Sequence, residues 1–168
     1  MSTVSAKALI NSVIILLTEA YAGPPDPSTT WFIDNEANSG ILGALEGVSA
    51  AEASRSVDSG GQEGSTIAAN AEHLRWSLAQ FNAAIRGGAH EGRWEESWHV
   101  ISLGEADWDN LRRRLREEFE TLCGLLKAQE ALPEEFISGT LASVAHAAFH
   151  LGLIRQMIAR VQQAAEPG

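Results

Sequence analysis

The longest regular pattern in the chain is a stripe of large apolar residues in its second half, which predicts a long amphipathic helix. Six apolar residues recur every three or four positions, with polar and charged residues between them: Trp108, Leu111, Leu115, Phe119, Leu122 and Leu126. This spacing places all six on one face of an α-helix. A helix with such a face is stable in water only if other elements cover it, so the stripe requires partner helices.

The remaining sequence predicts those partners. We expect long helices over residues 3–22, 66–86 and 141–164, each bounded by glycine, proline or capping residues. A further helical piece is predicted over residues 28–45, weakened where Asn38-Ser39-Gly40 interrupts it. No segment shows the alternation typical of a strand. The expected fold is therefore all-α: an up-down four-helix bundle with one or two extra short helices, in a single domain over residues 1–168.

The connections carry their own expectations. Residues 50–64 are predicted to form a loop, and the tryptophan-rich segment 91–98 a connection packed over the bundle end. Residues 102–105 offer a capping box before the striped helix. Residues 138–140 are expected to split off one short turn before the last long helix.

Charge and composition exclude some classes of function. The chain has 12 Lys and Arg against 22 Asp and Glu, a formal charge of −10, with 45% apolar and 20% charged residues. The apolar share is that of a folded protein, and the negative field repels a phosphate backbone, so no nucleic-acid partner is expected. The basic run Arg112 to Arg114 lies among glutamates and is explained by a solvated helix face.

The single cysteine and the N-terminus bear on location. Cys123 is the only cysteine, so no intramolecular disulfide is possible, and it is interpreted as a small buried hydrophobe. The N-terminal apolar segment loosely resembles a signal peptide, but polar residues interrupt it and its helical spacing favours a core helix. No other run approaches the length of a membrane span. We therefore expect a cytoplasmic protein without a membrane partner.

Three histidines form the most specific chemical pattern. His146 and His150 are four residues apart in an apolar stretch with Ala142, Leu153 and Met157, so one helix face would present both imidazoles inward. His73 lies in another apolar helical segment. Three imidazoles leave open coordination positions on a divalent metal, as in catalytic sites. The alternative is three hydrogen-bonded core histidines without a metal, and His90 and His99 are interpreted as ordinary loop histidines.

The order of these histidines resembles the DinB superfamily. His73 lies within Ala71–Arg75, and His146 and His150 lie in a later HxxxH pair followed by Leu151-Gly152. The Gly-Ala-Leu-Glu-Gly stretch at 43–47, the tryptophan-containing connection and Trp108 also fit the layout of that family. The chain departs from it in the proline-rich segment that contains Trp31, and at Arg155.

The resemblance implies a DinB-type four-helix bundle that binds nickel, zinc or another divalent ion through His73, His146 and His150. Relatives include thiol-dependent S-transferases and a mycothiol-dependent maleylpyruvate isomerase, so it implies a low-molecular-weight thiol, a small electrophilic substrate and a homodimer. A metal-dependent S-transferase or hydrolase is the leading hypothesis. A non-catalytic metal- or small-molecule-binding bundle that dimerises is the alternative. No residue is identified as a general base.

The tryptophans outside the striped helix leave two interpretations open. Trp31, Trp94 and Trp98, together with Trp108, can line a ligand pocket or can cap the end of the bundle. Capping is the default expectation. Glu72 adjoins His73 but points about 100° away from it on a helix, so a surface or supporting role is expected.

Overall fold

The computed structural model describes residues 4–31, 34–58, 64–89, 92–99 and 102–164, and all of the regular structure in these ranges is helical. Four long helices, α1 (Ala6–Ala22), α4 (Ile67–Ile85), α5 (Glu105–Lys127) and α6 (Glu134–Gln163), make up most of it. Three short elements accompany them: α2 (Ile41–Glu46), α3 (Ala50–Ala53) and the 3₁₀ helix η1 (Trp94–Trp98). The all-α prediction is confirmed.

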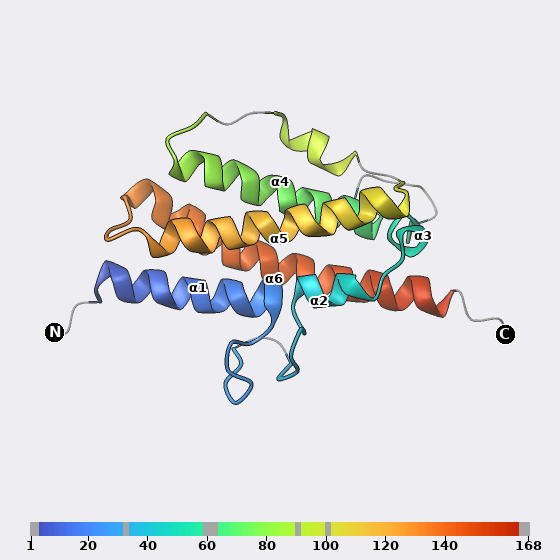
Figure 1. Cartoon of the computed structure of the whole chain (residues 1–168), viewed down its shortest axis with the longest axis horizontal. Coiled ribbons are helices and arrows are strands. Elements are labelled where there is room, and N and C mark those ends of the chain that lie inside the picture. Colours follow the sequence, from blue (N-terminus) through green and yellow to red (C-terminus); the bar gives the residue numbers. More distant parts are fainter. Residues whose placement is uncertain (1–3, 32–33, 59–63, 90–91, 100–101, 165–168) are drawn as a thin grey trace.

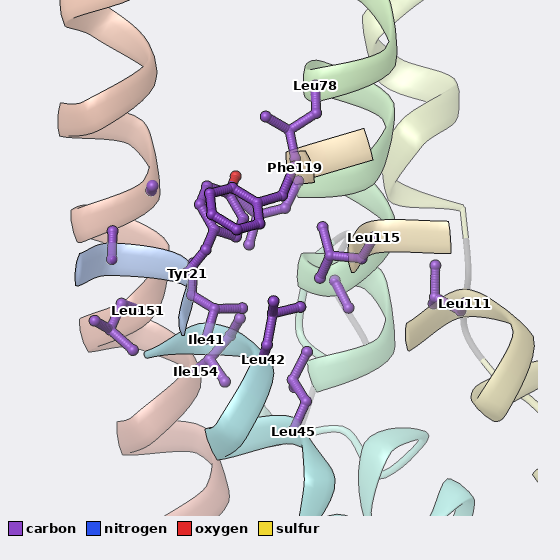
Figure 2. Packing of buried hydrophobic residues seen from close by; sticks show 14 of the residues in the cluster. Tyr21, Ile41, Leu42, Leu45, Leu78, Leu111, Leu115, Phe119, Leu151 and Ile154 are labelled. Atoms are coloured by element: carbon purple, nitrogen blue, oxygen red, sulfur yellow. The ribbon is translucent and has the colours of Figure 1, made fainter. Parts of the chain in front are cut away.

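The long helices surround one core. Helix α4 packs on α5 and α6, and α1 packs on α6 and α5, so each long helix contacts two others (Figure 1). The predicted stripe of α5 faces this core, and all six of its apolar residues are buried. Tyr21 stacks on Phe119 with ring centroids 4.9 Å apart, and Leu151 and Ile154 approach from α6 (Figure 2). Full burial of one such side chain stabilises the fold by about 1.5–3 kcal/mol.

Side chains cap the two long helices in the first half of the chain. The Ser5 hydroxyl accepts a hydrogen bond from the Ala8 amide at the start of α1, and the Thr66 hydroxyl accepts one from the Ala69 amide at the start of α4. Each hydroxyl satisfies an amide that the helix itself leaves free. The predicted beginnings of these helices are correct to within three residues.

The helix predicted over residues 28–45 is largely wrong, because among the described residues of that range helix begins only at Ile41, in α2. The Asp26 carboxylate accepts from both the amide and the hydroxyl of Ser28, which makes a local turn in place of a helix cap. The Trp31 amide donates to the carboxylate of Glu19, which is fully buried on α1. At the other end Asn38 has a φ of 59°, outside the helical region. The hydrogen bond from Trp31 to Glu19 therefore takes the place of a helical hydrogen bond.

The split predicted at residues 138–140 is also wrong, and α6 runs without a break from Glu134. Gly139 lies against α4, where an added Cβ would come 3.0 Å from the Phe81 ring. Thr140 returns its hydroxyl to the Phe136 carbonyl, a bond that a helix accommodates. The glycine therefore serves close packing between two helices and does not end one.

Two smaller expectations fail near α3. Residues 50–53 form a helix with a capping box between Ser49 and Glu52, where a loop was predicted. The capping box predicted at the start of α5 is absent, since Gly104 is the N-cap and makes no side-chain cap bond. The Glu105 carboxylate instead accepts from the Ala50 amide, 3.2 Å away, and so joins α5 to α3.

Helix α6 carries more exposed apolar surface than the sequence indicated. Its Phe136–Gln163 stretch is long and apolar enough to cross a membrane by length and composition. The 18-residue window in it that meets this criterion has a mean hydropathy of 1.4, and 28% of that window is buried. The prediction that no segment after the N-terminal one approaches the length of a membrane span is therefore wrong. Ala142 and Leu153, expected to face inward, are exposed, whereas Met157 is buried as predicted. Length and composition alone are weak grounds for a membrane span, and α6 also packs on α1 and α4.

Candidate metal centre

The structure brings the three predicted histidines together. His73 comes from the middle of α4, and His146 and His150 come from adjacent turns of α6. One ring nitrogen from each lies within 4.8 Å of the other two. His73 and His150 are each only 2% exposed, and His146 is half-buried. The contact between α4 and α6, combined with the four-residue spacing on α6, produces this convergence.

Ser97 fixes the orientation of His73. The Nδ1 atom of His73 lies 2.7 Å from the Ser97 hydroxyl oxygen, and that hydroxyl donates its own proton to the Trp94 carbonyl, also at 2.7 Å. With its proton used in this way, the Ser97 oxygen accepts from His73, so Nδ1 of His73 carries the proton. The Nε2 lone pair of His73 is then free and points toward His146.

Asn70 does the same for His150. Its amide nitrogen donates to the backbone carbonyls of Gly64 and Thr66, which orients its side-chain oxygen. That oxygen accepts from Nδ1 of His150 at 3.0 Å. His150 is therefore also protonated on Nδ1 and presents the Nε2 lone pair. Holding the far nitrogen of a ligating imidazole in this way is the usual supporting arrangement around protein metal sites.

The third histidine closes the cluster. Nε2 of His146 lies 3.1 Å from Nε2 of His73, close enough for one to donate a proton to the other. Since the His73 nitrogen is the acceptor, His146 donates, and transfer of its proton to Nδ1 would free all three lone pairs.

Burial keeps these rings neutral. It lowers the pKa of His73 to about 4, and the nearby His146 adds to the shift. It lowers the pKa of His150 to about 3, with further contributions from His146 and His73, and it also lowers the pKa of His146. Neutral imidazole is the form that binds a metal, so no proton has to leave the cluster at neutral pH.

A pocket of about 540 Å³ opens above the cluster. Its walls come from η1 and α6 and include Trp94, Trp98 and Phe149. Trp98 stacks on the His73 ring with centroids 3.7 Å apart. Gly64 permits this placement, because its φ is 77° and an added Cβ would lie 3.1 Å from the Trp98 ring.

Two of the four tryptophans considered as pocket residues line the pocket, and two do not. Trp94 and Trp98 line the pocket beside His73, so segment 94–98 packs along α4 and not over the bundle end. Trp108 is buried in the core and donates to the Val48 carbonyl, and Trp31 is 72% exposed near α1. Neither of these two lines the pocket.

Of the other candidate residues, Glu72, His99 and Cys123 do not line the pocket. Glu72 pairs with Arg75 at 2.6 Å, in agreement with a supporting role. His99 is exposed, and His90 lies outside the described residues. Cys123 is half-buried, with its pKa raised to about 11 by burial and by Glu120.

Sequence reasoning missed Asn70 and Ser97. Asn70 lies three residues before His73 on α4, and a buried asparagine one helical turn from a candidate ligand is a usable signal. Ser97 carried no such signal, because it meets His73 across 24 residues of chain.

The three histidines could hold a metal ion. Nitrogens bound to one tetrahedral ion at about 2.0–2.1 Å lie about 3.3 Å from one another. The histidine nitrogens already lie at this scale, from 3.1 Å for the His73–His146 pair up to 4.8 Å at most. Two of the three lone pairs are directed by fixed hydrogen bonds, so the site is largely prepared before a metal arrives.

No family model, curated protein or solved structure matches the chain.

Proposed function

We propose that this protein binds a divalent metal ion, zinc or nickel, through His73, His146 and His150. The observation that carries the proposal is the convergence of three neutral ring nitrogens within 4.8 Å at the base of a pocket. Because Nδ1 of His150 is taken up by Asn70, its Nε2 is the atom available to a metal ion at the base of the pocket.

We further propose that the metal centre belongs to an enzyme that acts on thiols, an S-transferase of the DinB type with a four-helix bundle fold. A bound divalent ion would supply Lewis-acid chemistry, which favours thiolate or hydroxide at neutral pH. The protein's own residues hold the imidazoles in place and exclude water from one side of the pocket with Trp94 and Trp98.

In the described part of the chain, the pocket walls supply no acid–base residue besides the histidines. Among the described residues, no Asp, Glu or Lys lines the pocket, so no carboxylate or amine there can act as a general base. A metal-bound water and a metal-bound thiol can both ionise without such a base, so these walls are compatible with either reaction, and the resemblance is what favours a thiol. The same observation supports the alternative, a non-catalytic bundle that binds a metal or a small molecule.

The resemblance that suggests this activity also suggests a homodimer, and the polar interruptions in the N-terminal apolar segment favour a cytoplasmic location. Exposed apolar side chains at Ile15 and Trp31, beside α1, are compatible with a second copy covering that face. Light scattering of the purified protein measures the oligomeric state directly.

Elemental analysis tests the metal centre. Protein produced without an affinity tag is stripped with a chelator and titrated with zinc and with nickel, and bound metal is measured after desalting. We expect one ion per chain, lost in His146→Ala. His99→Ala is the matched control, because that exposed histidine lies outside the pocket. Wild-type protein that binds no ion, or equal binding by both variants, would show that the proposal is wrong.

Turnover separates the two functions. The metal-loaded protein is incubated with a panel of thiols and electrophiles, and thioether formation is followed by mass spectrometry. Metal-dependent product that disappears in His146→Ala supports the enzyme, and stoichiometric metal without product favours the binding bundle.

A further inference from the structure

The pocket above the histidines has walls of one chemical kind. Apart from the histidines, Asn70 and Gly64, it is lined by the side chains of Trp94, Trp98, Phe149 and Leu153. Trp94 is 56% exposed and Phe149 is 66% exposed, so both stand at the mouth where a ligand would cover them. Large side chains left this open beside a cavity offer apolar area to a bound molecule.

Several polar groups in the pocket already have hydrogen-bond partners. Asn70 uses its amide nitrogen on two backbone carbonyls and its oxygen on His150. Nδ1 of His73 is held by Ser97, whose hydroxyl is in turn used on Trp94. The point on which the Nε2 atoms converge is therefore the anchor for a metal-bound ligand.

The charged residues nearest along the chain are turned to other partners. On η1, Arg93 lies 3.6 Å from the Glu95 carboxylate, and the carboxylate of Glu96 accepts from the Arg93 amide. On α6, Arg155 pairs with Asp34 at 2.9 Å. In the parts of the chain that the structure describes, the pocket thus offers no cation to a carboxylate or phosphate.

From these walls we infer that the pocket selects a compact aromatic molecule with an uncharged body and one metal-binding donor, of which an aromatic thiol is the simplest case. This inference rests on the proposed metal centre. A cavity of about 540 Å³ lies within the range of sites for small organic ligands. A thiol bearing carboxylates would leave them without a partner against indole and phenyl rings, and an unpaired charge in such surroundings weakens binding.

Two matched thiols test this selection. The zinc-loaded protein is titrated calorimetrically, without oxygen, with 4-methylbenzyl mercaptan and with 4-(mercaptomethyl)benzoate, which differ only at the end remote from sulfur. We expect the methyl compound to bind at least about tenfold more tightly. That ratio corresponds to a loss of about 1.4 kcal/mol in binding free energy for the unpaired carboxylate. A carboxylate that binds equally or more tightly would overturn the inference.

A pair of variants separates the pocket from the net charge of the chain. Phe149→Lys places a cation at the mouth, and it should lower or reverse the ratio between the two thiols. Trp31→Lys changes the net charge equally at an exposed position away from the pocket, and it should leave the ratio unchanged. Equal effects of the two variants would show that the field of the whole chain, and not the wall, discriminates.

A zinc titration comes first and distinguishes the two proposals. Wild-type protein that binds no zinc overturns both the metal centre and the ligand class. Protein that binds zinc but fails the thiol comparison overturns the ligand class alone.

Discussion

Acid should destabilise the metal-free protein well before its carboxylates titrate, because the fold buries neutral histidines. The pKa is lowered to about 4 for His73 and to about 3 for His150. An imidazole in the unfolded chain has a pKa of about 6.5, so the unfolded state takes up protons first as the pH falls. The contribution of these histidines to the free energy of unfolding is therefore fully present above about pH 7. It is lost progressively as the pH falls from about 6.5 to the pKa values of the folded state.

The magnitude follows from these pKa values. At pH 5 an unfolded imidazole is almost fully protonated while both folded rings remain neutral. The interval of about 1.5 pH units, at about 1.4 kcal/mol per unit, gives about 2 kcal/mol for each histidine. Because both rings border a pocket that admits water, we expect a total nearer 3 kcal/mol. That is a large part of the stability of an ordinary domain.

Urea unfolding at pH 7, 6 and 5 in the presence of a chelator measures this loss by circular dichroism. The His150→Leu variant provides the comparison, since it removes one of the three rings whose pKa burial lowers, and its loss of unfolding free energy between pH 7 and pH 5 should be about 1.5 kcal/mol smaller than that of the wild type. A wild-type protein equally stable at pH 5 and pH 7 would refute the burial argument. So would a variant that retains the whole pH dependence.

Three further predictions concern other parts of the structure. Ser97→Ala should weaken zinc binding about tenfold by releasing His73, as measured by calorimetry, and unchanged affinity would remove Ser97 from the site. Gly43→Ala should lower the free energy of unfolding by at least about 2 kcal/mol, because an added Cβ would lie 1.8 Å from the Asn38 carbonyl oxygen; an unaltered urea midpoint would contradict that contact. Cys123, whose pKa is raised to about 11, should react with a disulfide reagent at pH 8 about a hundredfold more slowly than after unfolding in urea, and equal rates would show an accessible thiol.

The spacing of residues along the chain was sufficient to predict features that depend on one helix alone. The α5 stripe was predicted from its spacing, and so was the shared face of His146 and His150, because helical geometry fixes which residues three and four positions apart meet. The helix prediction failed for the described residues between 28 and 40, although the capping-type residues at its start were identified. Ser28 bonds to Asp26 in a local turn, and the Trp31 amide donates to the Glu19 carboxylate on α1. No local rule ranks such a distant carboxylate above the next helical carbonyl.

The sequence by itself therefore determined where the four long helices lie and which two histidines share a face, since these depend on the geometry of one covalent chain. Only the tertiary structure decided that His73 completes the cluster, that Ser97 and Asn70 orient its rings, and that Trp98 stacks on one of them. These contacts join α4, η1 and α6. They depend on how packed helices fill a common volume, and residue spacing along the chain carries no record of that packing.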